Sequence, residues 1–482
     1  MAGLLGIGLT GINTSQANLL TTSHNITNAN TPGYSRQSTI VTTNAPMFSG
    51  AGFFGQGSRV DNVRRQYDQF LSQQVLTASA RKEEFSAYGA QITQLDNLLA
   101  DPNAGLSPAL AEFFAGVQDV ASNPTSMPAR QALISTAESL AARFNALDTR
   151  LNEIRDLNEG QIVGTVDSIN AYAGQIAQMN ERIGAAQLAG PSIAANDLLD
   201  QRDNLVAELN KLVKTTTVTE SDGSLSVFIG SGQGLVVGGS VATLVVAPDS
   251  SAPADPFRGE IRLATPAGGS VLLPDSLFGG GQLGGLLKFR DETLDSAREQ
   301  LGQIAVSVAG EVNAQHALGF DLDGNAGAGF FNDLSAMAAD PVSLRAAAGA
   351  FALVIDDARK IAASGPADAA RGVLAGPGNN ENALQLARLQ SSLVMQGGTA
   401  TFQSSYAQLV GFVGNKTREV QIGEAAHETQ LQQAIDAQQS LSGVNLDEEA
   451  ANLIRHQQSY QAAARIMSIA SSLFDEILAI SR

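Results

Sequence analysis

Apolar positions near the N-terminus recur in alternating steps of four and three residues. The spacing begins at Leu5, is interrupted by two polar positions, and has as its apolar members Leu5, Leu9, Ile12, Leu19 and Ile26. Steps that average 3.5 residues are typical of the apolar seam of a coiled coil. The sequence therefore predicts an N-terminal helix with one apolar stripe.

The C-terminal region repeats this pattern over more than four heptads. Asn445 is predicted to cap the helix, with Glu448 three residues later, and acidic residues at 447–449 suit the positive end of a helix dipole. Two matching end helices are expected to pack together as a long antiparallel bundle or coiled coil. The large side chains of the C-terminal stripe are Leu446, Leu453, Tyr460, Met467, Phe474 and Leu478.

Between the two ends, helical and strand-like patterns follow one another. Residues 63–99, 107–124 and 128–188 have apolar positions at helical spacing, with Gly and Pro mainly at the joints. From Lys214 the chain is rich in β-branched residues that alternate in short runs, and Asp222 with the next glycine marks a hairpin. The predicted fold class is mainly α with an inserted β-rich domain (α+β).

These patterns predict four parts of the chain. Residues 1–45 with 445–482 form a terminal helical domain, and residues 46–213 with 286–444 form a helical body. Residues 214–285 form a strand-rich domain, and residues 320–380 are a short segment rich in alanine and glycine.

Composition argues against several classes of function. The net charge is −18 and no basic run exists, which argues against binding of nucleic acid. The absence of cysteine removes thiolate metal sites and cysteine nucleophiles, and the four histidines have no metal-like spacing. We therefore expect no catalytic residue, no metal site and no cofactor.

The chain also lacks the marks of a membrane protein. The N-terminus has no basic region followed by an unbroken apolar stretch, so we predict no Sec signal peptide. No apolar run reaches the length needed to span a bilayer. We expect a soluble protein that, if exported, leaves the cell by another route.

Two motifs resemble ligand sites but fit them poorly. Residues 6–11 match G-x-G-x-x-G, yet a dinucleotide site needs a preceding strand and an acid about 20 residues later, and the first acid is Asp61. Glycines at a helix start are the favoured interpretation. Residues 321–333 begin like a calcium loop, but Ala326 and Asn332 replace the required glycine and acid, which favours a plain Asp/Gly turn.

The lack of charge near the N-terminus bears on where its helix is buried. No Asp, Glu, Lys or Arg precedes Arg36, whereas an ordinary surface helix carries charges on its outer face. We therefore expect both terminal stripes to be subunit contacts, with burial inside the same chain as the alternative.

The stretch SHNITNANTPGYSRQ, residues 23–37, is predicted to be a joint. Asn28 or Asn30 can adopt the left-handed conformation that ends a helix, and residues 31–34 suit a type II turn with Pro and Gly at its centre. Its amides can form hydrogen bonds between packed subunits without burying charge. The joint residues are Asn25, Asn28, Asn30, Pro32, Gly33 and Tyr34.

Both chain ends resemble one protein family. The stretch from LTGINTSQ to the joint looks like the N-terminal signature of bacterial flagellar rod, hook and hook-associated proteins, and SGVNLDEEAANLIRHQQSYQAAARIM looks like their C-terminal signature. Internal segments such as FFAGVQDVASNP, NDLLDQRDNLVAELN and QHALGFDLDGNAGAGFF are similar to those of the hook-associated members. The resemblance covers nearly the whole chain.

The resemblance implies a structural role without enzymatic activity. In this family the terminal helices are innermost and the strand-rich parts face outward, and the resemblance to the hook-associated members implies a junction ring between hook and filament. The implied partners are copies of the chain itself, the hook protein, the next hook-associated protein and an export chaperone at the C-terminal helix. Export through the flagellar type III apparatus implies an extracellular location. Residues 320–380 are expected to replace a second strand-rich insert.

Two alternatives stay open. Another flagellar axial protein, from the hook or the distal rod, would share both terminal signatures but should lack the LLDQRD and QHALGFD segments. An extracellular coiled-coil binding module would be expected to carry a Sec signal.

Overall fold

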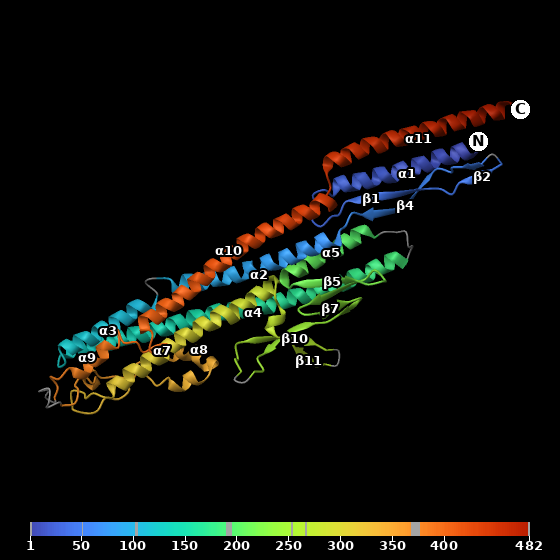
Figure 1. Ribbon diagram of the computed structural model, residues 1–482. Helices are drawn as coiled ribbons and strands as arrows, with labels where there is room; N and C mark the ends of the chain where they lie inside the picture. The colour runs from blue at the N-terminus through green and yellow to red at the C-terminus, as the bar shows by residue number, and fades with distance from the viewer. Residues whose placement is uncertain are drawn as a thin grey trace.

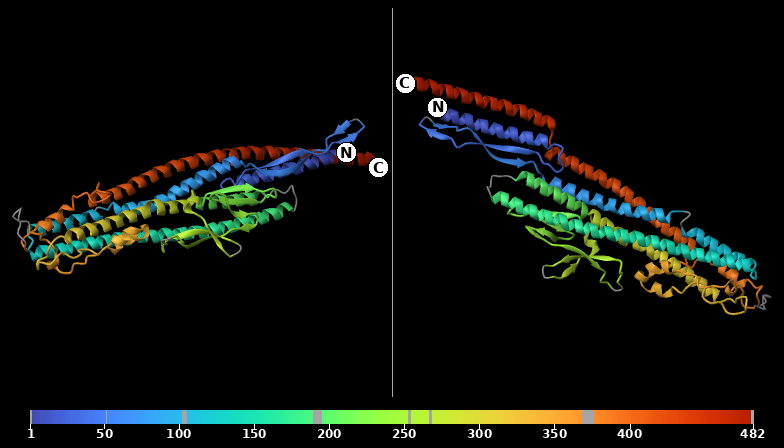
Figure 2. Two further views of the ribbon diagram at one scale, coloured as in Figure 1. Left: turned by 60° about the horizontal axis from the view of Figure 1, so that its bottom comes forward. Right: turned by 180° about the vertical axis from the view of Figure 1, so that it is seen from behind.

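The molecule is an elongated stack of long helices with both chain ends at the same end (Figure 1). The computed structural model describes residues 2–50, 52–101, 105–188, 195–251, 254–265, 268–367 and 376–480. Short strands lie beside the helices, one group along the middle of the stack and one hairpin near the two chain ends (Figure 2). The predicted fold class, mainly α with an inserted β-rich part, is confirmed.

The terminal helices pair as predicted. Helix α1 (Ala2–Thr27) and helix α11 (Leu446–Ile480) lie side by side and run antiparallel (Figure 1). Asn445 caps α11, because its side-chain oxygen accepts hydrogen bonds from the backbone N–H of Asp447 at 3.0 Å and of Glu448 at 3.4 Å. The G-x-G-x-x-G motif lies inside α1, so its glycines form no phosphate-binding turn after a strand.

A long hairpin that the sequence analysis did not predict follows α1. Strand β1 (Gln37–Thr43) pairs antiparallel with β4 (Ser58–Arg65), and β2 (Met47–Ser49) pairs with β3 (Gly52–Phe54) near the tip. The hairpin packs along α1, on the side away from α11 (Figure 1). The helix expected from residue 63 therefore begins later, at Gln69.

The body is a bundle of long helices with shorter helices at its far end and beside the strand-rich region. Its helices are amphipathic, and their buried positions follow the 3.6-residue period. The long members are α2 (Gln69–Leu99), α3 (Leu106–Ser122), α4 (Met127–Leu188), α5 (Asn196–Leu212), α7 (Asp295–His316) and α10 (Phe402–Ser442). The shorter ones are α6 (Gly281–Lys288), the π-helix η2 (Phe289–Leu294), α8 (Pro341–Ala350), α9 (Glu381–Arg388) and the 3-10 turns η1 (Asp275–Leu277), η3 (Ser335–Ala339) and η4 (Ala358–Lys360).

Aromatic rings join the far end of the body. The ring of Phe331 lies 5.6 Å from that of Phe113 on α3 and 4.5 Å from that of Phe351, which follows α8. Phe330 lies beside both Phe113 and Phe331. Because these side chains are fully buried, the FF pair fixes the segment after α7 to the body.

The strand-rich region consists of two small antiparallel sheets against α4 and α5. One sheet has the order β5-β6-β7-β8 and the other the order β11-β10-β9. Their inward residues form a second apolar core with α4, α5 and α6. The strands are β5 (Thr215–Thr219), β6 (Leu225–Ile229), β7 (Gln233–Val237), β8 (Ser240–Val241), β9 (Leu244–Pro248), β10 (Gly259–Ala264) and β11 (Ser270–Leu272).

The alanine- and glycine-rich segment 320–380 consists of turns and short helices where it is described, and residues 368–375 lie outside the described part. The carboxylate of Asp321 accepts hydrogen bonds from the backbone N–H of Asp323 and Asn325, each at 2.8 Å. This is the Asp/Gly turn that the sequence favours over a calcium loop.

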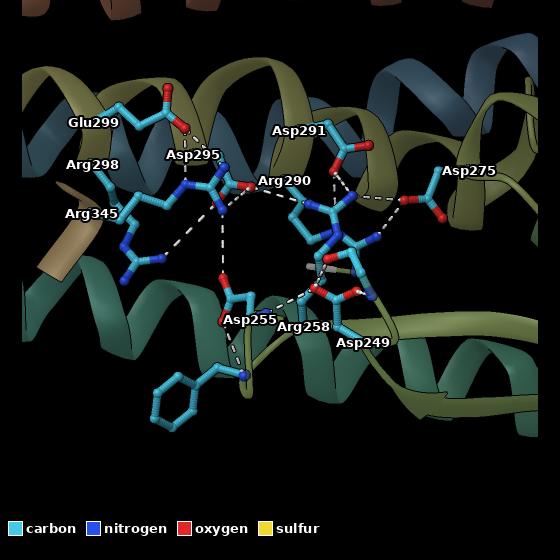
Figure 3. A network of polar contacts seen from close by, with 12 residues as sticks. Asp249, Asp255, Arg258, Asp275, Arg290, Asp291, Asp295, Arg298, Glu299 and Arg345 are labelled. Carbon is cyan, nitrogen blue, oxygen red and sulfur yellow. Dashed lines mark hydrogen bonds and ion pairs between the residues drawn. The ribbon is translucent and has the colours of Figure 1, made fainter. Parts of the chain in front are cut away.

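A buried ionic network joins the second strand-rich sheet to the helices (Figure 3). Arg290 on the π-helix is only 2% exposed, and it contacts Glu159 of α4 at 2.8 Å, Asp275 at 2.7 Å and Asp291 at 3.2 Å. These carboxylates outweigh the desolvation of the guanidinium and raise its pKa. Arg258, just before β10, contacts Asp275 and Asp291 as well. The network therefore fixes the sheet to the body.

Candidate assembly surface at the chain ends

Helices α1 and α11 approach each other most closely at small residues. A Cβ added to Gly8 would lie 2.8 Å from Cγ of Met467, and one added to Gly11 would lie 3.2 Å from Cβ of Ala463. Ala463 and Ala470 are buried on the α11 side. The seam between the two helices is therefore built on glycine and alanine, which permit a close approach.

The predicted stripe residues divide between this seam and the outer surface. Met467 contacts α1 of the same chain, so burial within the chain, the alternative considered from the sequence, accounts for part of the stripe. The side chain of Leu478 lies outside the described residues. Half-buried members are Leu5, Ile12, Leu19, Ile26, Leu453 and Met467, and exposed members are Leu9, Leu446, Tyr460 and Phe474. Their role as subunit contacts stays a prediction.

A second apolar stripe on α11 was missed. Ile466, Ile469, Leu473 and Ile477 follow one another at steps of three and four residues and are all exposed. They share a face of the helix next to the one that meets α1. Sequence analysis followed only one such register, although a search for parallel stripes on the same helix could have found this one. We call these four residues the outer stripe.

The joint contains the predicted turn. Gly33 has a φ of 76°, and the backbone N–H of Tyr34 donates to the carbonyl of Thr31 at 3.2 Å. Both observations match a type II turn with Pro32 and Gly33 at its centre.

The expectation that Asn28 or Asn30 ends α1 in the left-handed conformation is wrong. In the described part of the chain, the only residue other than glycine with positive φ is Gln396. The side-chain amide of Asn28 instead donates to the carbonyl of His24 at 3.0 Å, which also accepts from the backbone N–H of Asn28 at 3.1 Å.

Asn25 is the centre of the joint. Its side-chain amide donates to the carbonyl of Gln37 at 2.9 Å and to Glu449 at 3.2 Å. Its side-chain oxygen accepts from the backbone N–H of Gln37 at 2.9 Å and from the hydroxyl of Tyr34 at 2.7 Å. Burial, with a smaller contribution from nearby carboxylates such as Asp197, raises the pKa of Tyr34, so this hydroxyl stays a donor at neutral pH.

Two arginines connect the joint to distant parts of the chain. Arg36 pairs with Glu449 at 2.7 Å and with Glu448 at 2.9 Å, at the start of α11. Arg65, at the base of the hairpin, pairs with Asp200 of α5 at 2.9 Å and with Asp203 at 2.6 Å. The end of α1, the hairpin base, α5 and the start of α11 are thus fixed to one another.

Replacing Arg36 with methionine is expected to loosen the joint. Glu449 is 2% exposed, and removing one partner of a buried ion pair typically costs about 3–5 kcal/mol because the other charge is left uncompensated. Amides in the first turns of α11 should therefore exchange faster in hydrogen-exchange measurements.

The matched control is Arg59→Met, because Arg59 faces Asp61 at 3.9 Å in an exposed pair. Such a pair is worth about 0–1 kcal/mol, so exchange should hardly change. Equal exchange of α11 amides in both variants would show that the Arg36 pairs do not hold the joint.

This surface is suited to packing rather than chemistry. Among the described residues, no group of three or more His, Cys, Asp or Glu side chains is placed to hold a metal ion. Within the same residues, no helix has the length and apolar character needed to cross a membrane. What the chain ends offer is apolar surface, on α1, on α11 and at the hairpin tip.

Comparisons with known proteins agree with the resemblance of the chain ends. Residues 92–331 match the model of the flagellar hook-associated protein FlgK helical domain, and residues 435–480 match the flagellar basal body rod FlgEFG C-terminal model. Both matches come from the amino-acid sequence and are therefore independent of the contacts described above.

Full-length relatives are similar along the whole chain. The chain is 34% identical to flagellar hook-associated protein 1 of Salmonella typhimurium over 558 aligned positions that cover all of both chains. This length exceeds the 482 residues of the chain, so that relative has inserted residues that this chain lacks. The protein of the same name from Bacillus subtilis is 26% identical over 97% of the chain and 96% of that protein.

A solved structure has a similar fold. The flagellar hook junction protein FlgK from Burkholderia pseudomallei superimposes with a TM-score of 0.68 at 25% identity, covering 77% of this chain and all of that one.

Proposed function

Since the chain belongs to the family of flagellar hook-associated protein 1 (FlgK), whose members are structural parts of the bacterial flagellum, we propose that it joins the hook to the filament. In this role it polymerises through its terminal helices. The name of the Burkholderia relative, a hook junction protein, supports the proposal.

The observation that carries this proposal is the apolar surface gathered at one end of the molecule. Leu9 and Leu20 on α1, the outer stripe on α11 and the hairpin tip are all exposed there (Figure 1). Large exposed apolar patches on a protein mark interaction surfaces. No Asp, Glu, Lys or Arg precedes Arg36. Subunits can therefore pack around α1 without burying a charged side chain of these types.

The proposed partners follow from this arrangement. Copies of the chain form a ring or helical assembly, with the hook protein on one side and the next hook-associated protein on the other. Before assembly, an export chaperone covers the C-terminal helix, whose outer stripe is otherwise exposed to water. The chain reaches the outside of the cell through the flagellar type III apparatus.

The proposed domains have separate roles. Residues 1–45 with 445–482 form the inner assembly domain, and residues 46–213 with 286–444 form the body around it. Residues 214–285 face outward, and residues 320–380 stand in place of a second insert.

The test uses a bacterium that lacks its own copy of the gene. The natural chain should restore filaments, seen by electron microscopy, whereas Leu453→Lys or Phe474→Lys should not. Each lysine places a charge on the terminal surface, where Phe474 is exposed and Leu453 is half-buried. Filament subunits should then leak into the medium.

Val163→Lys is the matched control, because Val163 is an exposed apolar residue on α4 of the body. It should restore filaments as the natural chain does. Secretion of each variant is measured in the medium, which separates failed export from failed assembly. Normal filaments with the Leu453 or Phe474 variant would refute the proposed assembly through the terminal helices.

A further inference from the structure

The tip of the hairpin carries four large apolar side chains that face solvent. In the β2–β3 pairing, Met47 lies opposite Phe54 and Phe48 lies opposite Phe53. Because neighbouring residues of a strand point to opposite faces, the two pairs lie on the two faces of the hairpin. Phe48 is 66% exposed and Phe53 73% exposed, and their ring centroids are 5.2 Å apart.

Exposure of this much apolar surface is unusual for a structural turn. An aromatic side chain can bury about 150–250 Å², so four large side chains that are more than half exposed leave roughly 400 Å² uncovered, divided between the two faces of the hairpin. The two faces together equal the largest apolar patch on a typical monomer, about 300–600 Å², and such patches are often functional. No charged residue occurs from Gln37 to Ser58. A partner that covers the tip therefore buries no charged side chain of the hairpin.

The outer stripe of α11 is a second uncovered apolar surface near the same end of the molecule (Figure 1). Its four residues are exposed, and α1 lies between α11 and the hairpin (Figure 1). Since the tip and the stripe are both exposed in one chain, they do not cover each other. A contact between them has to join two molecules.

We propose that the hairpin tip of one copy docks on the outer stripe of α11 of a neighbouring copy, with the Phe48–Phe53 pair as the anchor. This inference rests on the proposed function, since it assigns two surfaces to the assembly of the chain. The two surfaces differ, so the contact is heterologous and can repeat from copy to copy into a ring or a helix.

The size of the tip indicates how it acts. A stable interface buries about 800 Å² on each partner, and the face of the tip that carries Phe48 and Phe53 supplies well under half of that area. The tip therefore works together with the terminal helices and does not hold two dilute monomers together alone. The contact has to be tested in assembled flagella.

The chain contains no cysteine, which permits a direct test by crosslinking. Two tagged forms, one with Phe53→Cys and one with Ile469→Cys, are expressed together in the deletion strain, and isolated flagella are treated with a short bismaleimide. Phe48, the other ring of the anchor, stays in place in this variant. Burying it is worth more than about tenfold in an association constant, so we expect a product that carries both tags, at least about tenfold above the control.

The control replaces Phe53→Cys with Val163→Cys, which lies on the exposed surface of the body. A second pair, Phe48→Cys with Leu473→Cys, keeps Phe53 in place and provides a separate readout if the first pair assembles poorly. Flagella that assemble with both pairs but give no product above the control would overturn the docking and leave the proposed function intact. A product with a different protein instead of a second copy would overturn it too.

The failure of the proposed function looks different. If the natural chain does not restore filaments in the deletion strain, the junction role is wrong whatever the crosslinks show.

Discussion

The double substitution Gly8→Leu and Gly11→Leu is expected to separate α11 from α1 and to abolish filament formation. Even a single Cβ at these positions would come within 2.8 Å and 3.2 Å of side-chain atoms on α11. Overpacking of this kind costs about 1–3 kcal/mol at each position. Because α11 packs mainly on α1 within the chain, few other contacts offset this loss.

The measurement combines electron microscopy with thermal unfolding of the purified variant. Filaments should be absent while the main unfolding transition of the body stays within a few degrees of the natural chain. The matched control is Gly160→Leu with Gly164→Leu, two helical positions on α4 where an added Cβ meets nothing within 4 Å. Filaments in normal number with the α1 variant would refute a close glycine seam.

Gly3 and Gly6 provide a further distinction on the same helix. An added Cβ meets nothing within 4 Å at either position, so leucine there does not disturb the pairing inside the chain. Filament loss with Gly3→Leu and Gly6→Leu would therefore report contacts with neighbouring copies, separately from the seam.

The second large effect is expected from Arg290→Met. This substitution removes the cation that Glu159, Asp275 and Asp291 share, and Arg290 is almost completely buried. Breaking a buried ionic cluster from one side costs about 3–5 kcal/mol. We expect this loss in urea unfolding, together with faster hydrogen exchange in β10, because Arg290 also donates to the carbonyl of Gly259 at 3.1 Å.

Arg150→Met is the control, since Arg150 forms an exposed pair with Glu153 at 2.8 Å and such a pair contributes about 0–1 kcal/mol. Combining Arg290→Met with Glu159→Gln tests whether the contact between these two residues stabilises the protein. Because the two residues are in contact, their effects should not add. Additive losses, or a loss under about 1 kcal/mol for Arg290→Met, would show that the network does not hold the sheet.

Much of the helical fold could be predicted because it depends on local patterns. The apolar stripes of the terminal helices, the cap at Asn445 and the change of pattern at Lys214 each involve neighbouring residues. The turn at Pro32 and Gly33 is equally local, since only glycine adopts its backbone conformation easily.

The hairpin was missed because its strands lack the usual signal. In β1 and β4 half-buried and exposed positions follow one another without a clean alternation, and the pairing of the two strands shifts register between Ile40 and Val41. Residues 58–65 also carry four charges, which obscures a strand pattern. Helical spacing was therefore extended into residues 63–65.

The joint and the ionic network depend on contacts that no local pattern contains. Asn25 was singled out as a joint residue, but its contact with Glu449 joins opposite ends of the sequence. Arg290 and Glu159 are likewise far apart in the chain. Residues that meet only after folding can be found from one sequence by their type, but their partners cannot.

The antiparallel pairing of α1 with α11 also imposes an order in time. Its two helices are separated by nearly the whole chain, farther than the body helices α2 and α10, which also pair across a long stretch of sequence, and distant contacts form late in folding. The paired ends, and the joint that needs Glu449, cannot exist until the last residues have been made and released. A chain truncated after α10 can thus fold its body yet never present the paired ends, so only a chain that includes α11 exposes the assembly surface.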